Sequence, residues 1–187
     1  MRFNSQGVAL LLAFLILAST ASPLSVWAKG TTIKERIGMG LEWIFAQEVE
    51  YLPGKTAYAR YVTLPNNRLF TEDNAKVVSM LVKHSQDFST TMYEHKLKAT
   101  LDFLSSSQTS KSDFYHFWDA QERVWQESGK FYHWNAIVLY AMAYSSFYMH
   151  TLYLPTSEYL YYDDIMERVG KATRAWQPTA QRSDGAW

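Results

Sequence analysis

Apolar side chains recur every three to four residues along most of the chain, which predicts helices rather than strands. The first predicted helix covers residues 32–52, where Ile33 and Ile37 follow this spacing. Thr32 is followed three residues later by Glu35, the arrangement of a capping box in which each side chain bonds the other residue's backbone N–H. The sequence therefore predicts a capped helix at this point.

The same periodicity predicts four further helices, and together the five indicate an all-α fold, an irregular bundle. Residues 55–70 are rich in aromatic side chains and contain the turn sequence LPNN, so they are predicted to form a connector. Residues 177–187 are expected to be a polar tail. The four further helices are predicted at residues 71–104, 112–129, 131–154 and 157–176.

The N-terminus has the layout of a secretory signal. Arg2 is followed by ten consecutive apolar residues, Val8–Leu17, and then by small residues and Pro23. This pattern predicts a signal peptide at residues 1–28, cleaved after Ala28 or, alternatively, after Ala21. The other interpretation is an uncleaved anchor, because the uncharged stretch is long enough to span a bilayer. A single helical domain is then expected over residues 29–176.

Residues 131–155 contain no charged side chain, which raises two interpretations. The stretch is long enough for a membrane span. Its histidines, serines and tyrosines lower its mean hydropathy below that of a typical span. If the N-terminal segment were an anchor with the N-terminus inside, Lys130 would lie outside the membrane and Glu158 inside, against the usual positive-inside bias. We therefore expect a buried central helix. Membrane association through residues 7–28 or 131–155 remains the alternative.

Composition excludes several classes of site. Lys plus Arg equals Asp plus Glu at 18 each, and no basic block exists, so a nucleic-acid partner is not expected. Cysteine is absent, which excludes disulfides, thiolate zinc sites, thiol nucleophiles and covalent c-type haem.

No set of residues predicts a cofactor, metal or catalytic site. His84 and His95 are 11 residues apart, about 16 Å along a helix, which is too far to share a metal ion. The Glu-x-x-His pairs of helical di-iron sites are missing, and Asp113-x-x-His116 is a single approximate match. Neither a nucleophile elbow nor a phosphate-binding glycine loop is present. The sequence thus favours a role other than catalysis.

The chain has more aromatic residues than a small core needs, with 13 Tyr and 7 Trp. Surplus Tyr and Trp side chains at a surface often anchor protein interfaces, although the same residues can also simply fill the core. The candidate partner-binding aromatics are Trp43, Tyr51, Tyr58, Tyr61, Tyr159, Tyr161 and Tyr162.

Three functional hypotheses follow. The first is an exported, secreted or periplasmic helical protein that acts as a binding, structural or accessory subunit of a cell-envelope assembly and contacts a protein partner. The second is an integral membrane subunit with a span at residues 131–155. The third is a helical metal- or haem-binding protein.

Overall fold

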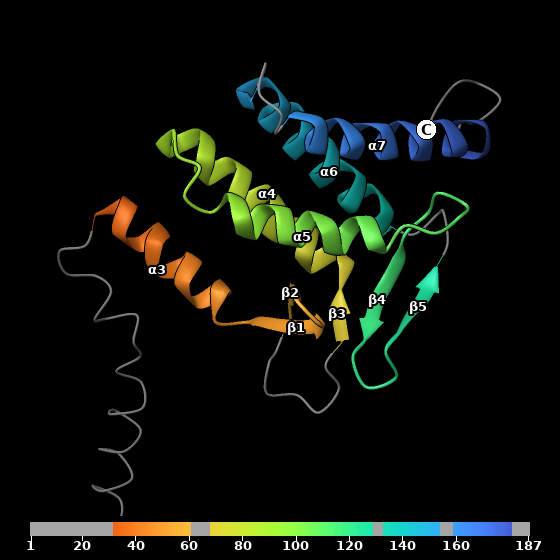
Figure 1. Ribbon diagram of the computed structural model, residues 1–187, viewed down its shortest axis with the longest axis horizontal. Coiled ribbons are helices and arrows are strands. Elements are labelled where there is room, and N and C mark those ends of the chain that lie inside the picture. The colour runs from red at the N-terminus through yellow and green to blue at the C-terminus, as the bar shows by residue number, and fades with distance from the viewer. Residues whose placement is uncertain (1–31, 61–67, 129–132, 154–158, 181–187) are drawn as a thin grey trace, which may run out of the picture. The chain divides into compact units, whose positions relative to one another are not determined.

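The computed structural model describes residues 32–60, 68–128, 133–153 and 159–180 (Figure 1). The chain divides into two units with the boundary between Trp43 and Ile44. The signal segment predicted at residues 1–28 lies outside the described residues, and the predicted single domain at 29–176 remains a prediction.

In the first unit, the capping box predicted at Thr32 is confirmed. The Thr32 N–H donates to Glu35 Oε2 at 2.6 Å, and the Glu35 N–H donates to Thr32 Oγ1 at 3.2 Å. The Thr32 hydroxyl also donates to Glu35 Oε2, at 3.0 Å. The bonds from the Thr32 N–H and the Thr32 hydroxyl hold the pKa of the Glu35 carboxyl below its ordinary value, because both favour the carboxylate. Helix α3 (Ile33–Phe45) begins here and ends in the second unit.

The predicted helix 32–52 is wrong beyond Phe45. Residues Glu48–Leu52 form strand β1, which pairs antiparallel with β2 (Lys55–Tyr58). The alternation Glu-Val-Glu-Tyr suits a half-buried strand, and Gly54 takes the positive φ of 72° that the intervening turn requires. Part of the predicted connector at 55–70 is therefore a hairpin strand.

The predicted helix 112–129 is also wrong, because this segment forms a β-hairpin. Strands β4 (Tyr115–Asp119) and β5 (Val124–Ser128) pair antiparallel, and β3 (Arg68–Phe70) adds to the other edge of β4. Figure 1 shows β4 and β5 side by side. Tyr115–Trp118 are mostly bulky aromatic residues, which favour a pleated sheet.

The predicted helix 71–104 is broken into α4 (Thr71–Phe88) and α5 (Glu94–Ser106). Ser89 takes a left-handed conformation with φ 49°, and it ends α4. The break coincides with the run Ser-Thr-Thr, whose hydroxyls compete with helical backbone hydrogen bonds. The two helices pack against each other as a helical hairpin.

The last two helices confirm the sequence prediction most closely. Helix α6 (His133–Tyr153) matches 131–154, and α7 (Tyr159–Ala180) starts within the predicted 157–176 and extends into the predicted tail. Helix α6 packs against α4 and α7, and Ala141, Met142 and Tyr162 are fully buried there. Within the described parts of the chain, none of the helices combines the length and the apolarity that crossing a membrane requires.

The predicted all-α class is thus correct only in its helical part. Five helices dominate the described residues, and two small antiparallel sheets accompany them. Asn74 joins the sheets to the helices, since its side chain accepts a hydrogen bond from the Tyr58 N–H at 2.8 Å and donates to the carbonyls of Tyr58 and Phe70 at 3.0 and 2.9 Å.

Candidate functional site

One face of α6 is uncharged and open to solvent. We call it the α6 seam. Its positions are separated alternately by four and three residues, and α6 contains no Asp, Glu, Lys or Arg. Apolar side chains occupy the centre of the seam and polar ones its ends, over a length of about 27 Å. The seam consists of His133, Ile137, Tyr140, Tyr144, Phe147 and Thr151.

The two most exposed seam residues are large and apolar. Tyr140 is 63% exposed and Phe147 is 70% exposed. The rings of Tyr140 and Tyr144 stack with centroids 5.7 Å apart and planes 16° from parallel. The Tyr144 hydroxyl donates to Gln86 on α4, which fixes the ring at the edge of the domain. The seam is therefore a pre-ordered aromatic surface.

The opposite face of α6 explains why the seam points outward. Val138, Ala141 and Met149 are fully buried in the packing with neighbouring helices. Ser145 and Ser146 are buried too, and both hydroxyls donate to the Met142 carbonyl, at 3.0 and 2.7 Å, so no polar group is left unsatisfied. Because the packing of this face fixes how α6 is rotated about its own axis, the aromatic side chains of the seam lie at the surface.

A small hollow of about 100 Å³ lies beside the seam, lined by Phe147 and His150 of α6 and by Asp163 and Met166 of α7. The His150 ring meets the ring of Tyr159 edge-on, with centroids 5.6 Å apart. The hollow is too small for a drug-sized ligand but is large enough for part of one side chain.

Several charged residues on α4 and α7 form ion pairs within their own helices. Lys83 bonds Asp87 on α4, and this bond raises the pKa of the Lys83 ammonium group. On α7, Lys171 bonds Glu167 at 2.7 Å. Part of the charge on the helices that flank α6 is therefore compensated within those helices.

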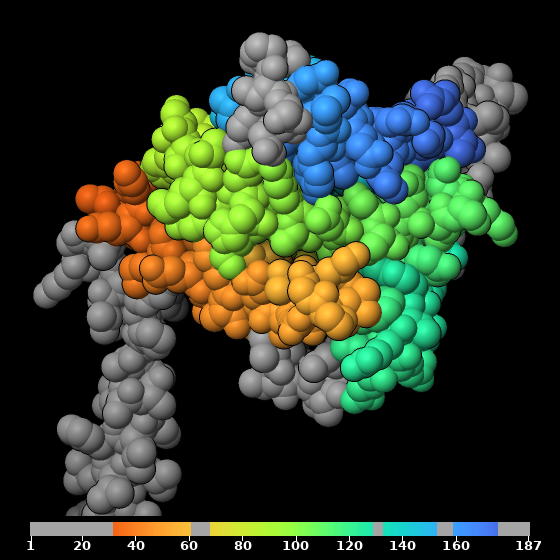
Figure 2. Space-filling view, viewed as in Figure 1, coloured from red at the N-terminus to blue at the C-terminus, as the bar shows by residue number. Residues whose placement is uncertain are grey.

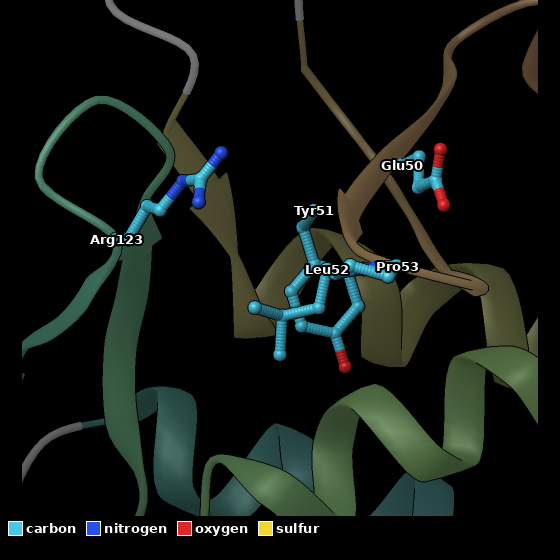
Figure 3. Close-up of a pocket in the computed structure, with 5 residues that line it drawn as sticks. All are labelled: Glu50, Tyr51, Leu52, Pro53 and Arg123. Atoms are coloured by element: carbon cyan, nitrogen blue, oxygen red, sulfur yellow. The ribbon is translucent and has the colours of Figure 1, made fainter.

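A second concave feature lies between the two hairpins (Figure 3). It encloses about 230 Å³ and is lined by Tyr51, Leu52 and Pro53 with Arg123 at one side. Figure 3 shows the Arg123 guanidinium turned toward these residues, while the Glu50 carboxylate points away. Glu50 instead accepts the Gly54 N–H at 2.6 Å. One guanidinium facing an open, mostly apolar hollow does not by itself define a ligand.

The aromatic residues next to this hollow form part of the core. The Tyr51 ring meets Phe103 and Trp118 edge-on, with centroids 5.1 and 5.8 Å away. Burial raises the pKa of the Tyr51 and Tyr58 hydroxyls. The Tyr58 hydroxyl and the Trp118 indole N–H have no hydrogen-bond partner among the described residues.

Polar side chains surround the first turn of α6. His133 Nε2 lies 3.1 Å from Glu72 Oε2, and Glu72 also bonds Lys76 at 2.5 Å. The bond from Lys76, together with that from His133, lowers the pKa of Glu72. Among the described residues, no three His, Asp or Glu side chains lie close enough to hold one metal ion.

The structure does not bring the predicted partner-binding aromatic residues together at one surface. Tyr51, Tyr58 and Tyr162 are buried, which argues against a role as exposed anchors. The half-buried Tyr161 donates to Asp102 at 2.7 Å, and its burial raises the pKa of its hydroxyl. Trp43 is 65% exposed and belongs to the first unit, whereas Tyr61 lies outside the described residues and the half-buried Tyr159 lines no part of the hollow.

Tyr140 and Phe147, the most prominent residues of the seam, were not predicted as candidates. The sequence predicts a buried central helix over this stretch and does not single out an exposed side. The same alternation of four- and three-residue steps also runs along the buried face through Trp134, Val138, Ala141 and Ser145, so the exposure of its side chains, and not the spacing, identifies the seam.

Comparison with protein-family models, with curated proteins and with solved structures finds no match to this chain. Function therefore has to be argued from the α6 seam itself.

Proposed function

We propose that this chain is an exported helical protein without catalytic activity that binds a protein partner, as an accessory or structural subunit of a cell-envelope assembly. The observation that carries the proposal is the α6 seam, where Tyr140 and Phe147 expose most of their rings on an uncharged helix face. Large exposed apolar patches on folded domains mark interaction sites, and Tyr is among the residues that contribute most to binding.

The expected export rests on the N-terminal segment, in which Arg2 precedes the apolar run Val8–Leu17. The envelope assembly is inferred from this segment together with the seam. No observation comparable to the α6 seam supports the membrane-subunit hypothesis or the metal- or haem-binding hypothesis. The seam therefore favours binding of a protein partner, which we call the docking role.

Photo-crosslinking in the producing cell tests the proposal. A photoreactive amino acid replaces Phe147 in one variant and Met92 in a matched control, because Met92 is 60% exposed but lies outside α6. We expect a covalent protein adduct from position 147 and none from position 92. The absence of any adduct at 147 and at 140, with the protein exported and folded, would contradict the docking role.

A further inference from the structure

The turn between β4 and β5 holds Arg123 in a strained backbone conformation. Its φ of 55° lies in the left-handed region, which residues with a β-carbon rarely adopt. Asp119 Oδ1 accepts the N–H groups of Gln121 and Glu122 at 3.0 and 3.1 Å, and these bonds fix the shape of the turn. Strained residues gather at binding sites, where the strain places a side chain for its ligand. The conformation of Arg123 therefore points to a role for its side chain.

The Arg123 guanidinium has no ion-pair partner among the residues that the structure describes. Glu50 lines the same hollow, but its carboxylate points away and accepts the Gly54 N–H at 2.6 Å (Figure 3). Glu122, the neighbour of Arg123 in the chain, accepts a hydrogen bond from the Gln126 side chain at 3.0 Å. The guanidinium thus faces the hollow without a described carboxylate to receive its N–H groups.

The hollow has largely pre-ordered apolar walls. Tyr51, Leu52 and Pro53 line a volume of about 230 Å³. The Tyr51 side chain is buried, and its ring packs edge-on against Trp118, which holds it in place. The ring of Pro53 restricts its own backbone. An apolar group can therefore bind here without the entropic cost of ordering Tyr51 and Pro53.

The charge at the hollow favours a carboxylate as the ligand. A guanidinium binds a carboxylate through two parallel N–H···O bonds, and the two single charges balance each other. A phosphate monoester carries about −1.5 to −2 at pH 7 and would need a second cation. The described lining residues supply none, and Glu50 adds a negative charge instead.

The size of the hollow favours the end of a larger molecule over a free small acid. Sites for small molecules enclose about 300–1,000 Å³ and bury most of the ligand surface. This hollow is smaller and is open to solvent. The end of a peptide chain needs room only for its terminal carboxylate and its last side chain, because the rest of the chain extends into solvent. Capture of a terminal carboxylate is a recurring mode of peptide recognition.

We propose that the hollow between the two hairpins binds the carboxyl-terminal end of a protein chain whose last residue is apolar. Arg123 pairs with the terminal carboxylate, and the last side chain packs against Leu52 and Pro53. The hollow shares no residue with the α6 seam, so this inference goes beyond the proposed function and does not depend on it.

Fluorescence anisotropy of labelled hexapeptides, titrated with the full chain, tests the proposal. Three peptides end in Val, Leu or Phe with a free carboxylate, and each has a counterpart that ends in an amide. We expect a dissociation constant of about 1 mM or lower for at least one free acid. Its amide counterpart should bind at least about tenfold more weakly, because the pair of charges is lost. A peptide that ends in Gly should bind at least about fourfold more weakly than the best free acid, because it buries no side chain.

Variants of Arg123 link the binding to the hollow. Arg123→Ala should weaken binding of the free acid at least about tenfold, whereas Arg123→Lys keeps the charge and should weaken it less. Arg123→Gly relieves the strained turn, so it should be at least as stable as the natural chain in urea while binding is lost. Arg174→Ala removes an exposed arginine on α7 and serves as the matched control, with unchanged affinity expected.

Three results would overturn the proposal. The first is equal affinity for the free acids and their amides, and the second is an affinity that Arg123→Ala leaves unchanged. The third is the absence of binding by every free-acid peptide up to about 1 mM. Binding of benzoate that requires Arg123, without binding of any peptide, would assign the hollow to free small acids and would also overturn the capture of a chain end.

Discussion

The Asn74 side chain bonds three backbone groups where two strands meet a helix. Its carboxamide bonds the N–H and the carbonyl of Tyr58 and the carbonyl of Phe70, all within the buried junction between β2, β3 and α4. Asn is the right side chain here because it offers one acceptor and two donors in a fixed geometry. Neither Ala nor a carboxylate reproduces that combination.

Asn74→Ala should therefore lower the free energy of unfolding by about 2–4 kcal/mol, because it leaves buried backbone groups without partners. Urea unfolding followed by tryptophan fluorescence measures the loss. Ser79→Ala is the matched control on the same helix, since the Ser79 hydroxyl only donates to the Ala75 carbonyl one turn away. We expect the control to change stability by less than about 0.5 kcal/mol, and equal losses in both variants would contradict the role of Asn74.

Glu72 makes a pH-dependent contribution to stability. The bond from Lys76, the largest cause, and that from His133 lower the pKa of Glu72 in the folded chain. The stabilisation is therefore present above the ordinary Glu pKa and is lost as the pH falls through the lowered folded value.

Glu72→Gln should destabilise the protein by about 0.5–1.5 kcal/mol at pH 7, and the difference from the natural chain should be smaller at about pH 3, below the ordinary Glu pKa. Chemical denaturation at both values measures this. Glu167→Gln provides the comparison, because Glu167 pairs with Lys171 at the exposed surface and contributes little. A Glu72 effect that is the same at pH 3 as at pH 7 would refute the electrostatic explanation.

At the scale of the elements, the sequence predicted helices where periodic apolar residues and clear ends coincide. The 131–154 prediction succeeded because the buried face of α6 is continuous from Trp134 to Met149. It failed to identify the seam because apolar composition alone does not distinguish a buried aromatic residue from an exposed one.

The secondary-structure predictions failed where a short apolar run fits both the helical and the strand periodicity. Phe114 and Phe117 are three residues apart, which suits a helix, and both are indeed buried. Pairing with β3, some 50 residues earlier in the chain, determines that β4 is a strand. The local sequence pattern does not show such a contact between distant segments. The hollow beside Arg123, which depends on the β4–β5 hairpin, could therefore not be predicted either.

The central position of α6 predicts a steric limit at Ala141, which is fully buried. Ala141→Leu adds three carbon atoms to a packed face and should lower stability by about 1–3 kcal/mol. Ala136→Leu on the exposed side of the same helix is the control and should be nearly neutral in dilute protein. Differential scanning calorimetry compares the two, and a neutral Ala141→Leu would contradict tight packing of α6.

The β4–β5 turn contains Arg123 at a positive φ of 55°. A side chain with a β-carbon is strained in this region, and glycine is not. Arg123→Gly should therefore raise stability by a few tenths to about 1 kcal/mol. Arg123→Ala, which removes the charge but keeps the β-carbon, should give no such gain; a gain in both variants would point to the charge instead.

At the scale of the whole molecule, the N-terminal prediction can be tested directly. Cleavage of a signal peptide after Ala28 gives a mature chain that starts at Lys29. Intact-mass analysis of protein recovered from an exporting host should show this start. A mass that retains residues 1–28 would instead support the uncleaved anchor.

Strand β3 pairs with β4 across the two intervening helices, with Arg68 opposite Asp119. On a ribosome that adds roughly 5–20 residues per second, these partners emerge about 3–10 s apart. The helical hairpin of α4 and α5 forms far faster than that, since local helices form within microseconds. Strand β3 thus stays unpaired for about 3–10 s, and the helical hairpin, which is complete once Ser106 has been added, precedes the end of β4 by about 1–3 s. The three-stranded sheet closes only after β4 has been synthesised.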